Sequence, residues 1–525
     1  MIQDRFAKWT ATAACALAMT AGTAGAAEFR WSFQSNIAGL DAMSTGDTST
    51  RNFLRNVYEG LVMLGPDMQP QPALATSWET VSETLWRFEL RPDVVFHDGS
   101  EFTADDVVFS FQRGNASTSD MKSRIAMIAD IRKVDDLTVE IETDGPAPTL
   151  LIGLTYMDIF DEGWATENEA AEPVLGTSDN ENYASRNANG TGPFQVVSFD
   201  TATGAVIEPH EAWWGEPEHN ITRGYFQPIS TDETRVAALL SGQVDMMFPV
   251  PQQDAPRIEA SPDHRIIQSP EDRVIFLGMD QARDELLYSN VEGANPFKDI
   301  RVRQAVYQAI DTELIREKVM RGAAGPIGAL VTPFAFGYHE ENDTRLPYDP
   351  EASKELLAEA GYPDGFEVTI DCPNDRYHND EQICVALASM LAEVGIELDV
   401  LAQTRNLYFS KIGNRDTSFY IHGWSSAPDA LSMMRFLLHS PTEDAGSWNV
   451  GSYANERVDE LIDQLGREID QDKRNEMFKE AFAIHREEIG VIPLHTQMLT
   501  WGVREGVEVR QRADSFLDLR YVMVD

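Results

Sequence analysis

Basic residues are scarce in this chain of 525 residues, which has 42 Lys and Arg against 86 Asp and Glu and a formal net charge of −44. Binding to nucleic acid or to an anionic membrane surface requires clustered cationic side chains. The charge balance therefore argues against both kinds of partner. It does not restrict the charge of a small ligand, because a local site can be basic within an acidic protein.

Motifs for catalysis and metal binding are also missing. The sequence contains no GxSxG, no HExxH and no phosphate-binding GxxxxGK[ST] motif. It has three cysteines, none in a CxxC pair, and ten scattered histidines, so no metal site is indicated. Acidic pairs are too common here to identify a glycosidase. We expect a protein that is not an enzyme and that needs no cofactor.

Long apolar runs are absent apart from a short one at the N-terminus. Residues 11–21 follow the basic residues Arg5 and Lys8, and a small-residue cleavage site ends at Ala26, as in a secretory signal peptide. The run is shorter than the roughly 20 residues of a membrane-spanning helix. The alternative is a soluble N-terminal helix. We expect an exported, periplasmic protein, cleaved near Ala26 and not inserted in the membrane.

Residues 75–113 form the most informative stretch of the sequence. Trp86, Phe88 and Leu90 alternate with charged residues, which predicts a half-buried strand. After a turn, residues 94–96 resume an extended apolar run. Thr103 precedes an acidic, then apolar, segment and is typical of a helix N-cap. The stretch predicts two strands, a turn and a capped helix.

This stretch resembles the signature of the extracytoplasmic solute-binding proteins, family 5, of peptide-type ABC importers. The resemblance rests on the strand at 86–91, the FHDG turn at 96–99 and the helix at 103–111. It extends over most of the chain through YEGL at 58–61, GTGPF at 190–194, FKDIRVRQAVYQAID at 297–311 and YDPEASKELLAEAGYP at 348–363. The family's LDP phrase has lost its proline here and reads Leu40-Asp41-Ala42.

The resemblance implies a mixed α/β fold of the type II periplasmic-binding-protein kind. Two lobes are expected, joined by a hinge, with an extra subdomain inserted in the first lobe. A chain of this length is too long for a single core, which agrees with several domains. The expected division is a signal peptide at 1–26, lobe I at 27–62, 187–276 and 491–525, the subdomain at 63–186, and lobe II at 277–490.

Two further elements are predicted from local patterns. A helix is expected from about Thr48 to Val62. Strands near 366–371 and 396–401 flank a helix near 380–393, and this spacing predicts a βαβ unit. The second lobe is therefore expected to be α/β.

Ligand-binding residues are implied by the family's pattern on lobe II. An arginine after the strand that ends at Cys372 can pair with a peptide carboxylate, and Arg376 occupies that place. The relatives' aspartate, which pairs with the peptide amine three residues after a Gly-Trp pair, is replaced by Ala427 after Trp424. Asp429, two residues further on and behind a proline, is the candidate for this anchor, and the alternative is that the anchor is absent. Arg405 falls where relatives often place an aromatic residue and offers a second cation for an anionic ligand.

Trp424 is a candidate for stacking on the ligand. Weaker ligand candidates are Trp448 and Asn449 on lobe II, and Thr48 and Arg51 at the helix start on lobe I. Each candidate also has a purely structural interpretation. Trp424 and Trp448 are also suited to core or loop packing. The alternatives for the two lobe II arginines are an ion pair of Arg376 with Asp375 or Asp380, and a surface position on a helix for Arg405.

Cys372 and Cys384 lie at the end of a strand and early in the next helix. An oxidising compartment permits a disulfide between them, which would stabilise the intervening loop by about 2–3 kcal/mol. The alternative is two buried free thiols.

The resemblance implies the substrate-binding component of an ABC importer. It captures a short peptide or related small solute by lobe closure and delivers it to permease subunits with their cytoplasmic ATPases. We expect a monomer. The second hypothesis is a non-peptide anion such as an opine-like carboxylate. Remote alternatives are an extracytoplasmic enzyme and a folding chaperone.

Overall fold

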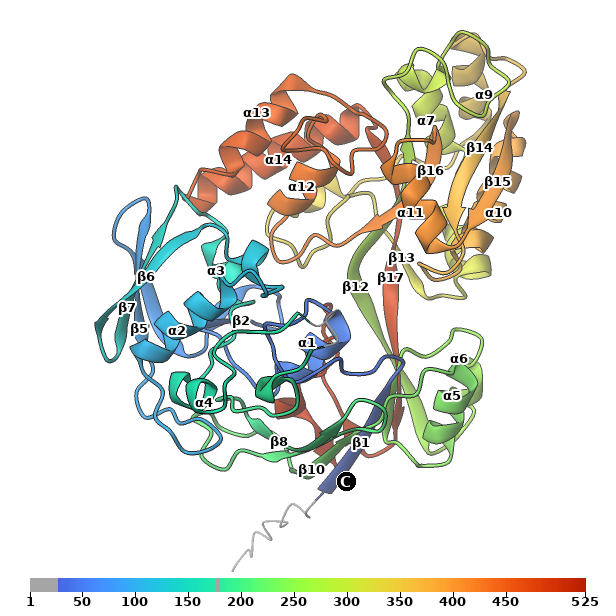
Figure 1. Cartoon of the computed structure of the whole chain (residues 1–525). Helices are drawn as coiled ribbons and strands as arrows, with labels where there is room; N and C mark the ends of the chain where they lie inside the picture. Colours follow the sequence, from blue (N-terminus) through green and yellow to red (C-terminus); the bar gives the residue numbers. More distant parts are fainter. Residues whose placement is uncertain (1–26, 176–179) are drawn as a thin grey trace, which may run out of the picture.

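The computed structural model describes residues 27–175 and 180–525, and it has two lobes joined by two long strands (Figure 1). Lobe I, the lower part of the figure, contains the first strand and the C-terminal end of the chain. Lobe II, the upper part, contains the elements from α7 to α14, with α12, α13 and α14 to the left of the others. The predicted mixed α/β fold is confirmed. The predicted signal segment, residues 1–26, lies outside the described residues.

One mixed sheet of eleven described strands runs through both lobes. Its order is β15-β14-β16-β12-β17-β11-β1-β10-β9-β8, and β13 also pairs with β17. The strands of lobe I are β1 (Ala27–Phe33), β8 (Phe194–Asp200), β9 (Gly204–Pro209), β10 (Ile221–Phe226) and β11 (Met246–Phe248). Those of lobe II are β13 (Ala324–Pro326), β14 (Phe366–Pro373), β15 (Ile396–Gln403) and β16 (Phe419–Trp424).

The two lobes are connected by β12 (His264–Met279) and β17 (Val491–Arg504), which pair antiparallel along almost their whole length. The register shifts at two places near the middle, between Pro270 and Val274 and between Ile275 and Phe276, and the first shift is the larger. Pro270 lies opposite Met498 and Val274 opposite Thr496, so the three residues 271–273 face a single residue of β17. Such a bulge bends a strand and increases its twist. The interruption gives the ribbon a place to flex between the lobes.

Helices cover the sheets in both lobes, and no described helix is long and apolar enough to cross a membrane. Lobe I contains α1 (Thr48–Leu54), α5 (Asp232–Leu240) and α6 (Ala255–Glu259). Lobe II contains α7 (Ile300–Gln308), α8 (Thr312–Leu314), α9 (Pro350–Glu359), α10 (Asp380–Ala392), α11 (Arg405–Gly413), α12 (Leu431–Leu437), α13 (Glu456–Leu465) and α14 (Gln471–Glu487). The predicted βαβ unit is β14–α10–β15, in which the two strands pair in parallel.

A four-stranded sheet forms a subdomain beside lobe I, at the left of Figure 1. Its strands, in sheet order, are β4 (Ala75–Thr80), β5 (Leu85–Leu90), β7 (Thr138–Thr143) and β6 (Ile128–Asp135). The helices of this region are α2 (Ala104–Gly114), α3 (Leu150–Leu154) and α4 (Glu162–Glu167). Short pairs β2 (Val62–Leu64) with β3 (Pro70–Pro72) and β18 (Val507–Glu508) with β19 (Met523–Val524) complete the described strands.

The N-cap of α2 agrees with its sequence pattern. The Thr103 side chain and the Asp106 carboxylate form a capping box.

The expected strand at 94–96 is replaced by a turn-rich segment, in which Val95 forms only an isolated bridge with Glu101. Asp93 and Gly99 both adopt positive φ angles, so the chain turns twice within seven residues and leaves no length for a strand.

Helix α1 is shorter than the sequence suggested, ending at Leu54 rather than near 62. The next carbonyl groups are used elsewhere: Asn56 O accepts from Phe194 N, and Val57 O accepts from Gly192 N. A Cβ on Gly192 would lie 2.6 Å from the Val57 carbonyl oxygen, so the close approach requires glycine. The GTGPF segment thus replaces the helix's own hydrogen bonds.

A buried ion pair links the first loop of lobe I to the subdomain. Arg113, at the end of α2, donates from Nη1 and Nη2 to the two carboxylate oxygens of Asp41 at 2.9 and 2.6 Å, and both side chains are almost inaccessible. The guanidinium also lies over the Phe160 ring. Removing one partner of such a pair leaves an uncompensated buried charge.

We expect Asp41→Asn to lower the free energy of unfolding by roughly 3–5 kcal/mol, because it leaves the Arg113 guanidinium buried without a counter-charge. Asp130→Asn, an exposed aspartate on β6, is the matched control and should change stability little. Urea denaturation monitored by circular dichroism measures both variants. Equal stabilities of the two variants would contradict the assigned role of the pair.

Candidate functional site

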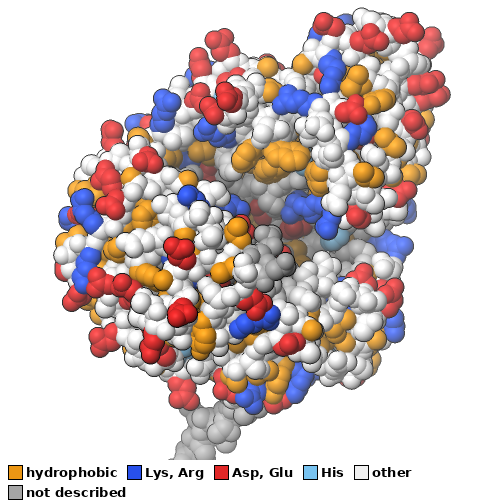
Figure 2. Space-filling model, in the orientation of Figure 1, with side chains coloured by type: hydrophobic (Ala, Val, Ile, Leu, Met, Phe, Trp, Pro, Cys, Tyr) orange, Lys and Arg blue, Asp and Glu red, His pale blue; other side chains and the backbone are white. Residues whose placement is uncertain are grey.

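A cavity of about 260 Å³ lies where the lobes meet the hinge. We call it the interlobe cavity. Its walls come from α1 of lobe I, from the hinge residues 271–273, from residues 425–428 of lobe II and from the C-terminal residues 513–515. Figure 2 shows the hollow between the lobes, with hydrophobic and basic side chains along its upper border. A ligand there would contact both lobes and the hinge at once.

Asp272 connects the hinge bulge to lobe II. Its carboxylate accepts hydrogen bonds from the hydroxyls of Thr332 and Ser426 and from the backbone N–H of Ala427 at 2.7 Å. Its own N–H donates to Ala513 O in the C-terminal segment. Burial raises the pKa of this carboxyl, while the hydrogen bonds oppose the shift. The bulge is therefore held by specific polar contacts on both sides.

Three arginines gather near the hinge, and we call Arg273, Arg376 and Arg405 the basic cluster. Desolvation, followed by repulsion from Arg273, lowers the pKa of Arg376, and Arg405 adds a smaller effect of the same sign. Arg273 is paired with Glu271 at 3.2 Å. Among the described residues, the guanidinium groups of the other two have no ion-pair partner. Two cations of the cluster are thus free to bind an anion.

Aromatic side chains form a surface beside the basic cluster. We call Phe409, Trp424, Phe436 and Trp448 the aromatic platform. Trp424 lies 5.8 Å from Phe436 and 6.3 Å from Trp448 between ring centroids, and Phe409 lies 5.9 Å from Trp448. Phe436 is 40% exposed. Such faces are suited to stacking on an apolar or aromatic part of a ligand.

His422 lies beneath the platform, with ring centroids 5.9 Å from Trp424 and 5.6 Å from Trp448. Its Nδ1 lies 3.1 Å from the Tyr377 hydroxyl, which accepts a hydrogen bond from Gly423 N. Burial, with help from the charges of Arg376 and Arg273, lowers the pKa of His422 to about 3. The imidazole is therefore neutral at physiological pH.

The site residues expected from the sequence divide into two groups. Thr48 and Arg51 line the interlobe cavity. Arg376, Arg405, Trp424 and Trp448 lie outside its lining, in the basic cluster and the aromatic platform. The backbone N–H of Arg376 donates to Asp380, but its guanidinium pairs with no acid in the part of the chain that the structure describes.

The remaining two candidates make contacts within lobe II. Asp429 is buried, and its carboxylate is paired with Arg474 at 2.7 Å. Asn449 is buried and bonded to the backbone of His439 and Tyr453. Both side chains already have partners, so we no longer propose Asp429 as the amine anchor or Asn449 as a ligand contact.

The structure contains a disulfide between Cys372 and Cys384, with the Cα atoms 6.7 Å apart. It connects the end of β14 to the second turn of α10. The loop between the two cysteines carries Arg376. The bond therefore restricts the position of one arginine of the basic cluster.

Sequence reasoning missed the hinge residues 271–273 and the lobe I residues Arg124 and Tyr156, which all line the cavity. A signal for the hinge was present. Pro270 followed by three charged residues interrupts a segment of otherwise strand-forming residues, and proline inside a strand marks a bulge or an edge. Arg124 and Tyr156 have no comparable local signal.

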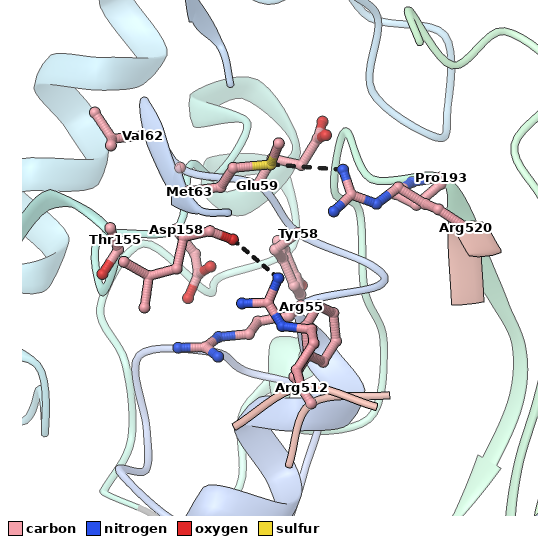
Figure 3. Close-up of a pocket in the computed structure, with 13 residues that line it drawn as sticks. Arg55, Tyr58, Glu59, Val62, Met63, Thr155, Asp158, Pro193, Arg512 and Arg520 are labelled. Carbon is pink, nitrogen blue, oxygen red and sulfur yellow. Dashed lines mark hydrogen bonds between the residues drawn. The ribbon is translucent and has the colours of Figure 1, made fainter. Parts of the chain in front are cut away.

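A smaller neighbouring pocket, of about 60 Å³, contains three more arginines (Figure 3). Arg55, Arg512 and Arg520 converge there from α1 and from the C-terminal segment. Each already has an acidic partner: Asp514 for the first two and Asp518 for the third. This pocket therefore joins the C-terminal segment to lobe I and is not the candidate ligand site.

Comparison with known proteins agrees with this geometry. The family model described as bacterial extracellular solute-binding proteins, family 5, matches residues 69–444. The chain belongs to this family. Heme-binding protein A of Haemophilus influenzae is 28% identical over 453 residues, covering 81% of this chain and 78% of that protein. The glutathione-binding protein GsiB of Salmonella paratyphi A is 24% identical over 477 residues, covering 89% and 88%.

Solved structures of similar fold cover nearly the whole chain. HbpA2 from Haemophilus parasuis superposes with a TM-score of 0.81 at 20% identity, covering 95% of this chain and 100% of that one. The murein tripeptide binding protein MppA, in an unliganded open form, gives 0.77 at 19% identity, covering 95% and 98%. AgaA in complex with agropinic acid, from A. tumefaciens R10, gives 0.69 at 22% identity, covering 95% and 99%. The family 5 fold is thus shared along the chain.

The neutral state of His422 predicts a pH dependence of stability. Its pKa is lowered from 6.5 to about 3 in the folded protein, so between these values only the unfolded chain takes up the proton. This contribution to stability is complete above pH 6.5 and is lost as the pH falls. We expect His422→Gln to reduce the fall in unfolding free energy between pH 6 and 4 by up to about 1.4 kcal/mol per pH unit.

Chemical denaturation of the wild type and the variant across this pH range measures the difference. An NMR titration of the His422 ring in the folded protein is the direct check. Protonation of this ring near pH 6 would contradict the prediction.

Proposed function

We propose that this family 5 protein is the substrate-binding component of an ABC importer, and that it captures a small anionic solute, a short peptide or a related compound, between its lobes. The observation that carries the proposal is the interlobe cavity. It is lined by both lobes and by the hinge, so a ligand bound there favours the closed form. Permease subunits with their ATPases are the receiving partners. The protein acts as a periplasmic monomer.

The hinge geometry supports capture by closure. The bulge at 271–273 interrupts the ribbon that joins the lobes, and hinges are short segments that absorb changes in φ and ψ. The fold is more similar to the unliganded open form of MppA than to AgaA with its ligand, as judged from TM-scores of 0.77 and 0.69. These values are those expected for separated lobes.

The side chains of the basic cluster and the aromatic platform support an anionic ligand with an apolar part. Arg376 and Arg405 offer guanidinium groups that have no acidic partner within residues 27–175 and 180–525, and guanidinium binds carboxylate in a bidentate manner. The aromatic platform beside them is suited to an apolar group. Haem, glutathione and agropinic acid, the ligands of three of the similar proteins, all carry carboxylates. The relatives are binding proteins, which supports a role without catalysis.

A non-peptide carboxylate is the second candidate, and one observation favours it. The acid nearest to the family's amine-binding position, Asp429, is already paired with Arg474. A ligand without a free amine does not need an acidic anchor. The role of the importer is the same for both ligand classes.

Native mass spectrometry of protein purified from the periplasm without unfolding tests the proposal, followed by identification of any released solute. We expect a single bound anion of small mass. Small-angle X-ray scattering of the stripped protein should show a decrease in radius of gyration when this solute is returned. A solute that binds at 1:1 without closure would contradict capture between the lobes.

We expect Arg376→Ala to weaken binding of the identified solute by about 10-fold or more, because a charge-assisted contact of roughly 1.5–3 kcal/mol is lost. Arg467→Ala, an exposed arginine between α13 and α14 and outside the cavity lining, is the matched control. Isothermal titration calorimetry measures both. Equal affinities of the two variants would remove Arg376 from the site.

A further inference from the structure

A second group of cations, apart from the basic cluster, lines the lobe I wall of the interlobe cavity. Arg51 of α1 and Arg124, at the end of the 3-10 turn Lys122–Arg124, both lie over the ring of Tyr156. Their guanidinium carbons are 5.6 and 4.7 Å from its centroid, and all three residues line the cavity. One tyrosine ring therefore holds two guanidinium groups at the cavity wall.

The hydrogen bonds of Arg51 are incomplete. Its Nη1 donates to Asp158 at 2.8 Å and to Ala42 O at 2.9 Å. Its Nε and Nη2 are buried and have no partner among the described residues, and the side chain is only 6% exposed. Buried donors without an acceptor are costly, so retained ones call for an explanation. These two atoms have almost no exposed surface, so an oxygen acceptor on a ligand in the cavity would bind them only after a shift of the side chain.

The charges of this wall do not cancel. Asp158 compensates Arg51, and Asp514 compensates Arg55. Arg124 is exposed and, among the residues that the structure describes, has no ion-pair partner. The wall thus has a surplus cation beside two donors that lack acceptors. In a chain with a net charge of −44, a local surplus of this sign points to binding of an anion.

We propose that Arg51, Arg124 and Tyr156 form a second anion subsite on lobe I, and that the imported solute carries two anionic groups. This inference rests on the proposed function and names its substrate class. One group binds the basic cluster of lobe II, and the other binds the lobe I subsite. The apolar middle of the solute lies toward the aromatic platform. A solute of this kind bridges the two lobes and so stabilises closure.

Three probes with the same apolar middle test the inference. N-succinyl-Leu-Phe carries a carboxylate at each end, N-acetyl-Leu-Phe carries one carboxylate, and the dipeptide Leu-Phe carries an amine and a carboxylate. Isothermal titration calorimetry with the stripped wild-type protein compares their affinities. We expect N-succinyl-Leu-Phe to bind at least 10-fold more tightly than N-acetyl-Leu-Phe.

The variant Arg124→Gln identifies the subsite. We expect it to abolish the preference for the second carboxylate while leaving the affinity for N-acetyl-Leu-Phe unchanged. Lys122→Gln removes a charge from the same 3-10 turn, at an exposed residue outside the cavity lining, and should preserve the preference. Arg51 is not substituted, because its loss would leave Asp158 buried and unpaired. Thermal unfolding of each variant confirms that it is folded.

Other outcomes overturn the inference, and they separate it from the proposed function. If N-acetyl-Leu-Phe or Leu-Phe binds as tightly as the succinyl compound, the second anionic group is not recognised, but capture of a small solute stands. If Lys122→Gln and Arg124→Gln change the preference for the second carboxylate equally, long-range charge explains both effects. The subsite is then overturned, but capture of a small solute stands. If none of the three probes binds, the inference and the proposed peptide-like class of ligand fail together.

Discussion

The antiparallel pairing of β12 with β17 is the constraint on which the rest of this structure depends. It carries the sheet of one lobe into the sheet of the other, and a continuous ladder of hydrogen bonds resists bending. The bulge at 271–273 is the larger of the two places where this ladder is interrupted. Asp272, within the bulge, is bonded to lobe II through Ser426 and Ala427 and to the C-terminal segment through Ala513. The hinge, lobe II and the C-terminal segment are therefore connected at one residue, Asp272, through its carboxylate and its backbone N–H.

The same region connects the basic cluster, the proposed anion-binding group, to the hinge. Glu271 pairs with Arg273 and accepts a hydrogen bond from Gln497, the β17 residue opposite the bulge. Gln497 in turn accepts from the backbone of His378, in the loop that carries Arg376. An anion that binds the basic cluster competes with Glu271 for Arg273. Ligand binding can thus change the contacts of the hinge without a separate relay.

The sequence was sufficient for what is encoded locally. The capping box of α2, the β14–α10–β15 unit and the two-lobed α/β architecture all follow from short patterns or from the family's phrases. Contacts between distant segments were not predictable in this way. Asp41 was noted only as part of a phrase, although it pairs with Arg113. Helix α1 ends early because a segment more than 130 residues away takes its carbonyl groups. Asp429 was a reasonable amine anchor until its pairing with Arg474 was visible.

The acidic surface surrounds a group of arginines at the interlobe cavity and the basic cluster. This arrangement affects both folding and the approach of a ligand. Guanidinium groups placed close together repel one another, and the acidic surroundings partly offset that repulsion. The same surroundings repel an anionic solute at long range, but at physiological ionic strength this repulsion is screened beyond about 8 Å. Inside the cavity, screening is weaker and the arginines dominate. The acidic exterior therefore favours solubility, while the proposed selectivity for anions is confined to the short distances at which the cavity acts.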